Sequence, residues 1–120
     1  MLVVEDDEAT LDSIVALLAS YGYEVVGANS GPTALALLRD IRPRLIIILD
    51  LHMPGMDGWQ FRAELLCDPD LARIPILIVS AAGTPVVRAA AEAMRAAAAL
   101  VKPVDADELV GLVARFTGDR

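Results

Sequence analysis

The amino-acid sequence predicts an α/β domain in which a parallel, doubly wound sheet of five strands is covered by helices on both faces. Short apolar and β-branched runs alternate five times with segments whose apolar residues recur at helical spacing. The most apolar run, residues 45–49, has no alternating polar positions, which indicates a strand buried on both faces. Because crossovers between parallel strands are right-handed, only a few doubly wound strand orders remain.

The expected strands are short and rich in Val, Ile and Leu, which suit a buried sheet. They span residues 1–5, 24–28, 45–50, 75–79 and 98–101. The last strand follows an alanine-rich stretch, 89–99, that is typical of a helix, so the boundary there is placed only to within several residues.

The expected helices span residues 9–20, 32–40, 58–67, 85–97 and 105–116. Ser30 and Thr84 are predicted N-caps, because each precedes a proline at a position where a missing N–H costs little. Asp105 precedes the last helix with Glu108 three residues later, which is the spacing of a capping box. The first and last helices each carry one apolar stripe that predicts contact with the sheet: Leu11, Ile14, Val15 and Leu18, and Leu109, Leu112, Val113 and Phe116.

Composition and charge argue against several classes of function. A net charge of -7 with scattered arginines disfavours direct nucleic-acid binding, which needs a basic surface. No apolar stretch approaches the roughly 18 to 20 residues that span a bilayer, and no basic segment precedes an apolar one as in a secretory signal. Cys67 is the only cysteine, so no internal disulfide can form, and a reducing cytoplasm is the expected compartment. We expect Cys67 to pack within its apolar helical pattern.

Polar side chains stand at the ends of four apolar runs. Glu5 and Asp6 follow the first run, Asp50 ends the third, Ser80 follows the fourth and Lys102 follows the fifth. Ligands of open α/β sheets bind outside the carboxyl ends of the strands, so these residues are predicted to form one site. Lys102 is the only lysine in the chain, and its compact ammonium can reach a phosphate or carboxylate.

The acidic residues of this site need a partner charge. Two carboxylates about 4 Å apart repel by roughly 4 kcal/mol at an effective dielectric of 20, so Asp6 beside Asp50 requires a proton or a cation. Hard oxygen ligands without histidine nitrogen or thiolate suit Mg²⁺, with Mn²⁺ as an alternative. Asp7 and Glu8 are instead interpreted as a solvated start of the first helix, where acids favour the helix dipole.

A metal-bound carboxylate, an ammonium and a hydroxyl together describe a place for a phosphoryl group. Asp50 is the predicted nucleophile, because it ends the most apolar run and therefore belongs to a central strand. Lys102 and Ser80 are the predicted contacts of the phosphoryl oxygens. The loop 51–58 contains a proline and two glycines, which indicates a tight turn beside the nucleophile.

These motifs resemble the receiver domain of two-component response regulators. The resemblance rests on Val3-Val4-Glu5-Asp6-Asp7, Leu49-Asp50-Leu51-His52-Met53-Pro54-Gly55-Met56-Asp57-Gly58, Val79-Ser80-Ala81 and Val101-Lys102-Pro103. It covers residues 1–120, with a core at about 1–117, and implies a single domain without an output domain. It also implies a flavodoxin-like (βα)5 fold with strand order 2-1-3-4-5.

The resemblance further implies a role for each site residue. Asp50 would accept a phosphoryl group from a phosphohistidine on a sensor kinase or phosphotransfer protein. Asp6 would bind Mg²⁺ directly, Glu5 largely through water, and the backbone carbonyl of His52 would complete the protein ligands. Lys102 would contact the phosphoryl group and Asp50, with Ser80 as the switch hydroxyl.

The domain would act as a signalling module rather than an enzyme, promoting its own aspartyl phosphorylation and dephosphorylation. The signal would leave through the face around the fourth helix, fifth strand and fifth helix toward a downstream protein target. Dimerisation through this face is as compatible with the sequence as a monomer. The His52 side chain is expected at the rim of the site, where it would influence the dephosphorylation rate, because a lone histidine offers no metal-ligand spacing.

The sequence departs from the family pattern at two places. Most receivers have an aromatic residue three positions before the lysine, whereas this chain has Ala99, so coupling from Ser80 to an aromatic side chain cannot operate in its usual form. The first strand begins at Met1, which suggests a natural start upstream. The first departure leaves one alternative open, a pseudo-receiver that acts as a phosphorylation-independent interaction module.

Overall fold

The computed structural model describes residues 1–40 and 46–118. Along the chain it has β1 (Leu2–Val4), α1 (Glu8–Ser20), β2 (Val26–Ala28), α2 (Gly31–Asp40), β3 (Ile47–Asp50), α3 (Gly58–Leu66), α4 (Pro69–Ala72), β4 (Ile76–Ser80), α5 (Thr84–Met94), β5 (Ala98–Val101) and α6 (Ala106–Thr117). The five strands form one parallel sheet in the order β2-β1-β3-β4-β5. The predicted flavodoxin-like fold and its strand order are therefore confirmed.

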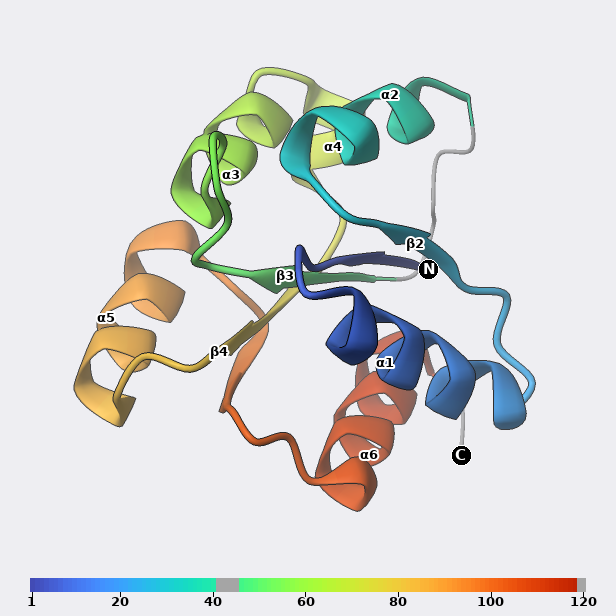
Figure 1. The fold of residues 1–120 in the computed structure, drawn as a ribbon. Coiled ribbons are helices and arrows are strands. Elements are labelled where there is room, and N and C mark those ends of the chain that lie inside the picture. Colours follow the sequence, from blue (N-terminus) through green and yellow to red (C-terminus); the bar gives the residue numbers. More distant parts are fainter. Residues whose placement is uncertain (41–45, 119–120) are drawn as a thin grey trace.

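The helices form a layer on each face of the sheet (Figure 1). On one face, α1 and α6 pack through Leu11, Leu18, Leu109 and Val113 onto strand residues that include Val3. On the other face, α2, α3 and α5 pack onto the alternate residues of the same strands through a list of buried side chains: Ala34, Leu38, Phe61, Leu65, Val87, Ala90 and Met94. Burial on both sides explains why β3 and β4 read as continuous apolar runs.

The N-terminal ends of the helices test the N-caps predicted from the sequence. The backbone N–H of Thr33 donates to Ser30 Oγ (3.2 Å), and that of Glu108 donates to Asp105 Oδ1 (3.0 Å), so both predicted caps are confirmed. The prediction for Thr84 is wrong, because α5 already begins at Thr84 and Gly83 is its N-cap without a side-chain bond.

Several element boundaries differ from the expected ones. The helix α4 was not predicted, because its four residues are too few to show helical periodicity, although Asp68 caps it. The predicted fourth and fifth helices therefore correspond to α5 and α6. The predicted fourth helix, 85–97, ends at Met94, since Arg95 adopts a left-handed conformation with φ 53°. Cys67 is exposed at the end of α3 rather than packed, and Leu45 of the predicted third strand lies outside the described residues.

Candidate functional site

The strand order brings the predicted site residues to one edge of the sheet. Glu5 follows β1, Asp50 ends β3, Ser80 ends β4 and Lys102 follows β5. Three of these side chains are almost fully buried, because Glu5 is 2% exposed, Asp50 5% and Ser80 0%. A buried group of this polarity at the carboxyl edge of a parallel sheet is an arrangement that binds ligands.

Three carboxylates converge at this edge. Glu5, Asp6 and Asp50 each offer an oxygen atom, and these atoms all lie within 4.8 Å of one another. Asp6 is half-buried, so the cluster opens to solvent on its side. Oxygen ligands without histidine or thiolate partners form a donor set that suits a hard divalent cation.

Lys102 lies among these carboxylates, and its closest partner is Glu5 rather than Asp50, the partner predicted from the sequence. Its Nζ atom is 2.5 Å from Glu5 Oε1 and 3.7 Å from Asp50 Oδ1. The second oxygen of Glu5 accepts from the backbone N–H of Asp7 (3.2 Å). Glu5 is therefore held from two sides.

Burial and neighbouring charge set the ionisation of the two central groups. Burial and the negative charge of Glu5 raise the pKa of Asp50 to about 7, although Lys102 and the backbone N–H of His52 partly offset them. Burial alone would lower the pKa of Lys102, but the bond to Glu5 and the charges of Asp50, Glu5 and Asp6 outweigh it and raise that pKa. Lys102 is thus a fixed cation, while Asp50 exchanges a proton near neutral pH.

Ser80 is buried between β4 and the following loop. Its hydroxyl oxygen accepts from the backbone N–H of Ala82 (3.2 Å), and its carbonyl oxygen accepts from that of Lys102 (2.7 Å). Ser80 also pairs with Val101 in the parallel register of β4 and β5. The backbone of Ser80 is therefore hydrogen-bonded directly to the end of β5.

The loop after Asp50 is anchored by the start of α3. The backbone N–H of Gly58 donates to the carbonyl of Leu51 (2.8 Å), and Asp57 forms a complete capping box with Gln60. A Cβ atom on Gly58 would lie 2.9 Å from the carbonyl oxygen of Asp50, so only glycine allows this approach of helix to strand. This close packing orients the backbone that carries Asp50.

His52 has an exposed side chain and lies two residues after Asp50 in the chain; its place at the rim of the site stays a prediction. Its imidazole faces the indole of Trp59 on α3, with the ring centroids 5.9 Å apart and the planes inclined by 55°. The predicted contribution of its backbone carbonyl to a metal site remains a prediction.

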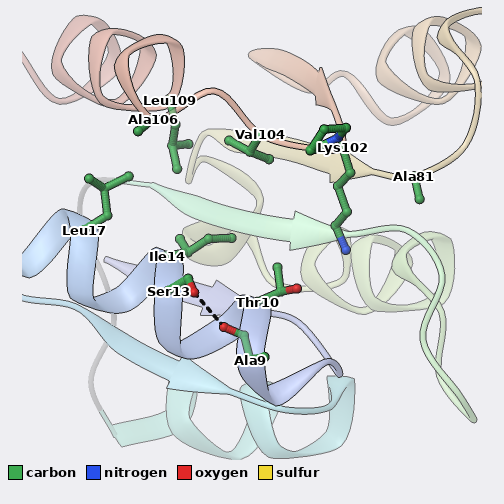
Figure 2. Close-up of a pocket in the computed structure, with 11 residues that line it drawn as sticks. Ala9, Thr10, Ser13, Ile14, Leu17, Ala81, Lys102, Val104, Ala106 and Leu109 are labelled. Atoms are coloured by element: carbon green, nitrogen blue, oxygen red, sulfur yellow. Dashed lines mark hydrogen bonds between the residues drawn. The ribbon is translucent and has the colours of Figure 1, made fainter.

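A largely apolar groove of about 800 Å³ opens beside Lys102 between α1 and α6 (Figure 2). Ile14 and Leu17 line it from α1, Leu109 from α6 and Val104 from the loop before α6. The Lys102 side chain lies at one end, so a molecule seated in the groove would be next to the carboxylate cluster.

Sequence reasoning missed Arg62, which was interpreted only as one of the scattered arginines. Its side chain is 6% exposed, and its Nε atom donates to the carbonyl oxygen of Met94 (3.0 Å) at the end of α5. Burial lowers the pKa of this guanidinium. The bond ties α3 to α5, and no local pattern could have signalled it, because the two residues are 32 positions apart.

The fold and the acidic edge define a flavodoxin-like signalling domain. Residues 1–114 match the family described as the response regulator receiver domain, and the chain belongs to this family. It is 29% identical over 110 residues to protein PilH of Pseudomonas aeruginosa, covering 92% of this chain and 90% of PilH. It is 39% identical over 117 residues to response regulator protein FleR of the same species, covering 96% of this chain but 24% of FleR. The chain thus spans only about a quarter of that longer relative.

Solved structures agree with this assignment. The chemotaxis protein CheY4 of Vibrio cholerae superposes with a TM-score of 0.87 at 30% identity, covering 96% of this chain and 95% of CheY4. The receiver domain of sensor histidine kinase PA1611 from Pseudomonas aeruginosa has a TM-score of 0.87 at 27% identity, covering 98% of this chain and 96% of that domain. In that structure a magnesium ion is coordinated in the active-site cleft.

Within residues 1–40 and 46–118, no helix combines the length and the apolar character needed to cross a bilayer.

Proposed function

We propose that this receiver domain accepts a phosphoryl group on Asp50 from a phosphohistidine of a sensor kinase or a phosphotransfer protein, in a reaction that depends on Mg²⁺. The single observation that carries the proposal is the convergence of Glu5, Asp6, Asp50 and Lys102 in one cluster. In the reaction, a carboxylate oxygen of Asp50 bonds to phosphorus as the bond from phosphorus to the histidine nitrogen breaks. The imidazole leaves with the electron pair.

The carboxylates fit a magnesium site. Asp6 and Asp50 would bind the ion directly, Glu5 through water, and the backbone carbonyl of His52 would complete the protein ligands; Mn²⁺ suits the same donors. A cation held there would neutralise charge on the phosphoryl oxygens and favour the ionised, nucleophilic form of Asp50.

The remaining residues of the site position the phosphoryl group. The Lys102 ammonium lies 3.7 Å from Asp50 Oδ1, within reach of a phosphoryl oxygen on that carboxylate. The Ser80 hydroxyl, whose oxygen accepts from Ala82 N–H, would donate its own proton to another phosphoryl oxygen. The same groups would promote hydrolysis of the aspartyl phosphate by the domain itself. The groove between α1 and α6 offers a donor protein an apolar surface next to the acceptor.

Phosphorylation adds about -1.5 to -2 charge and three acceptor oxygens, which would draw Ser80 and Lys102 toward Asp50. The movement would shift the loop 81–84 and α5, and so alter the face formed by α5, β5 and α6 for a downstream protein target. We propose that this signalling takes place in the cytoplasm. A pseudo-receiver remains the alternative, because Ala99 removes the usual aromatic partner of the switch hydroxyl.

The test is intact mass after incubation with acetyl phosphate and Mg²⁺, and then with a phosphorylated histidine kinase. One added phosphoryl group is expected, and it should be absent from the Asp50→Asn variant and from a sample without Mg²⁺. Absence of the adduct with both donors would favour the pseudo-receiver.

The His52→Ala variant should accept a phosphoryl group but lose it at a different rate, because we place its exposed imidazole at the rim of the site, where it would influence hydrolysis. The half-life of the adduct by intact mass measures this effect. A Tyr21→Ala variant is a matched control, since Tyr21 is an exposed aromatic residue at the C-terminal end of α1. Complete loss of phosphorylation in His52→Ala would contradict the rim position.

A further inference from the structure

A hollow of about 350 Å³ lies over β5 between α5 and α6. Thr84, Val87 and Arg88 line it from α5, Ala99 from β5, and Asp105 and Glu108 from the start of α6. Since β5 ends the sheet on this side, no described strand covers its outer edge (Figure 1). Because the side chain of Ala99 is small, β5 is only half-buried at this position.

The size of the hollow limits its occupant. Small-molecule sites usually have about 300 to 1,000 Å³, so this hollow lies at the lower end of that range. This volume has room for one large side chain. Part of its apolar lining reaches the surface, because Val101 is 37% exposed. An aromatic side chain would cover this surface and gain the most from its burial.

The two walls carry opposite charges. Arg88 on α5 is exposed, and its guanidinium forms no ion pair within the described part of the chain, so its cation is available to an aromatic ring. On the α6 wall, Asp105 Oδ1 accepts only from the backbone N–H of Glu108, and neither carboxylate has a cationic partner among residues 1–40 and 46–118. These carboxylates attract lysine or arginine beside the inserted ring.

We propose that this hollow, the Ala99 pocket, binds an aromatic side chain of a partner protein that is flanked by lysine or arginine. The pocket is linked to the phosphorylation site, because Val101 in its lining pairs with Ser80 across the sheet. The backbone N–H of Lys102 also donates to the carbonyl of Ser80. Regulation of the pocket rests on the proposed function, whereas the pocket itself does not.

The experiment titrates the isotope-labelled full chain with two acetylated, amidated peptides while recording amide NMR shifts. Both peptides have a central residue between two lysines, and this residue is phenylalanine in one and alanine in the other. The phenylalanine peptide should shift amides of the α5, β5 and α6 lining, with an affinity about tenfold or more above that of the alanine peptide.

Two variants locate the binding. Ala99→Leu fills the pocket and should abolish the preference for phenylalanine. Ala63→Leu makes the same change at an exposed position on α3 and should bind like the parent chain. Equal binding of the two peptides, shifts confined to other surfaces, or full binding by Ala99→Leu would each overturn the proposal. Self-association without added peptide, detected by sedimentation, would assign the face to a second copy and overturn it as well.

Repeating the titration with a phosphoryl mimic tests the link to Asp50. A changed affinity for the phenylalanine peptide is expected. An unchanged affinity would contradict the proposed regulation by phosphorylation but not the proposed binding of the aromatic side chain. Intact mass measures phosphorylation separately. A chain that binds the phenylalanine peptide but forms no phosphoryl adduct would contradict the proposed function alone. A chain that is phosphorylated but does not bind the peptide would contradict the proposed pocket alone.

Discussion

The Asp50→Asn variant should be more stable to unfolding than the parent chain by about 2 to 4 kcal/mol at about pH 8 without metal. The buried carboxylate lies beside Glu5, and its pKa is raised from 3.8 to about 7. Ionisation of Asp50 above neutral pH therefore costs the folded state more than the unfolded state. Asparagine removes this cost, while Lys102 keeps its partner Glu5.

The direction of the pH dependence follows from the raised pKa. Below about pH 4, Asp50 is protonated in both the folded and unfolded states, so its ionisation makes no contribution to the difference between variant and parent. Between about pH 4 and pH 7 only the unfolded state releases the proton, so the stability of the parent chain falls relative to the variant. Above about pH 7 the difference stays at its maximum.

Urea unfolding across this pH range, in the presence of a chelator, measures the difference. The Asp12→Asn variant is the control, because it makes the same change at an exposed position on α1, and it should not reproduce the gap seen for Asp50→Asn. Saturating Mg²⁺ should stabilise the parent chain more than Asp50→Asn and so narrow the gap. A gap that is constant with pH would contradict the buried, charge-coupled state of Asp50.

The Gly58→Ala variant should be destabilised by about 2 to 3 kcal/mol, since the new methyl group overlaps backbone atoms that cannot rotate away. The Cβ atom would lie 2.9 Å from both the carbonyl oxygen of Asp50 and the Cα atom of Leu51. Relief of this contact requires α3 to move away from the end of β3. We therefore also expect slower phosphorylation of Asp50, because the loop after it loses its anchor.

Gly111→Ala is the matched control for this substitution. Gly111 lies within α6, and no atom of the described residues stands within 4 Å of the position of an added Cβ atom. Alanine there should stabilise the helix by about 0.5 to 1 kcal/mol through its lower conformational entropy in the unfolded chain. Chemical denaturation measures the change in the free energy of unfolding for both variants. An equal change would show that a Cβ atom at position 58 meets no steric restriction.

Much of the fold was predictable because its signals are local. Apolar periodicity identified five strands and five helices, and the capping roles of Ser30 and Asp105 depend only on residues within the same turn. Local signals also failed at two places. The helix α4 is too short for periodicity, and Thr84 was misjudged because its position relative to the first helical turn depends on the preceding loop.

The site residues were predictable for a different reason. In a parallel sheet, the carboxyl ends of all strands share one edge, so polar residues that follow apolar runs must meet there. The sequence alone therefore determined the fold class and brought Asp50, Ser80 and Lys102 into one candidate site.

Only the tertiary structure decided which of these groups touch. The ion pair of Lys102 with Glu5 joins residues 97 positions apart, and the bond from Arg62 to Met94 depends on how α3 packs beside α5. The Ala99 pocket likewise exists because two helices on opposite faces leave the edge strand open between them. Contacts of this kind depend on the packing of distant elements, whereas periodicity and caps act within a few residues, so no local pattern could specify them.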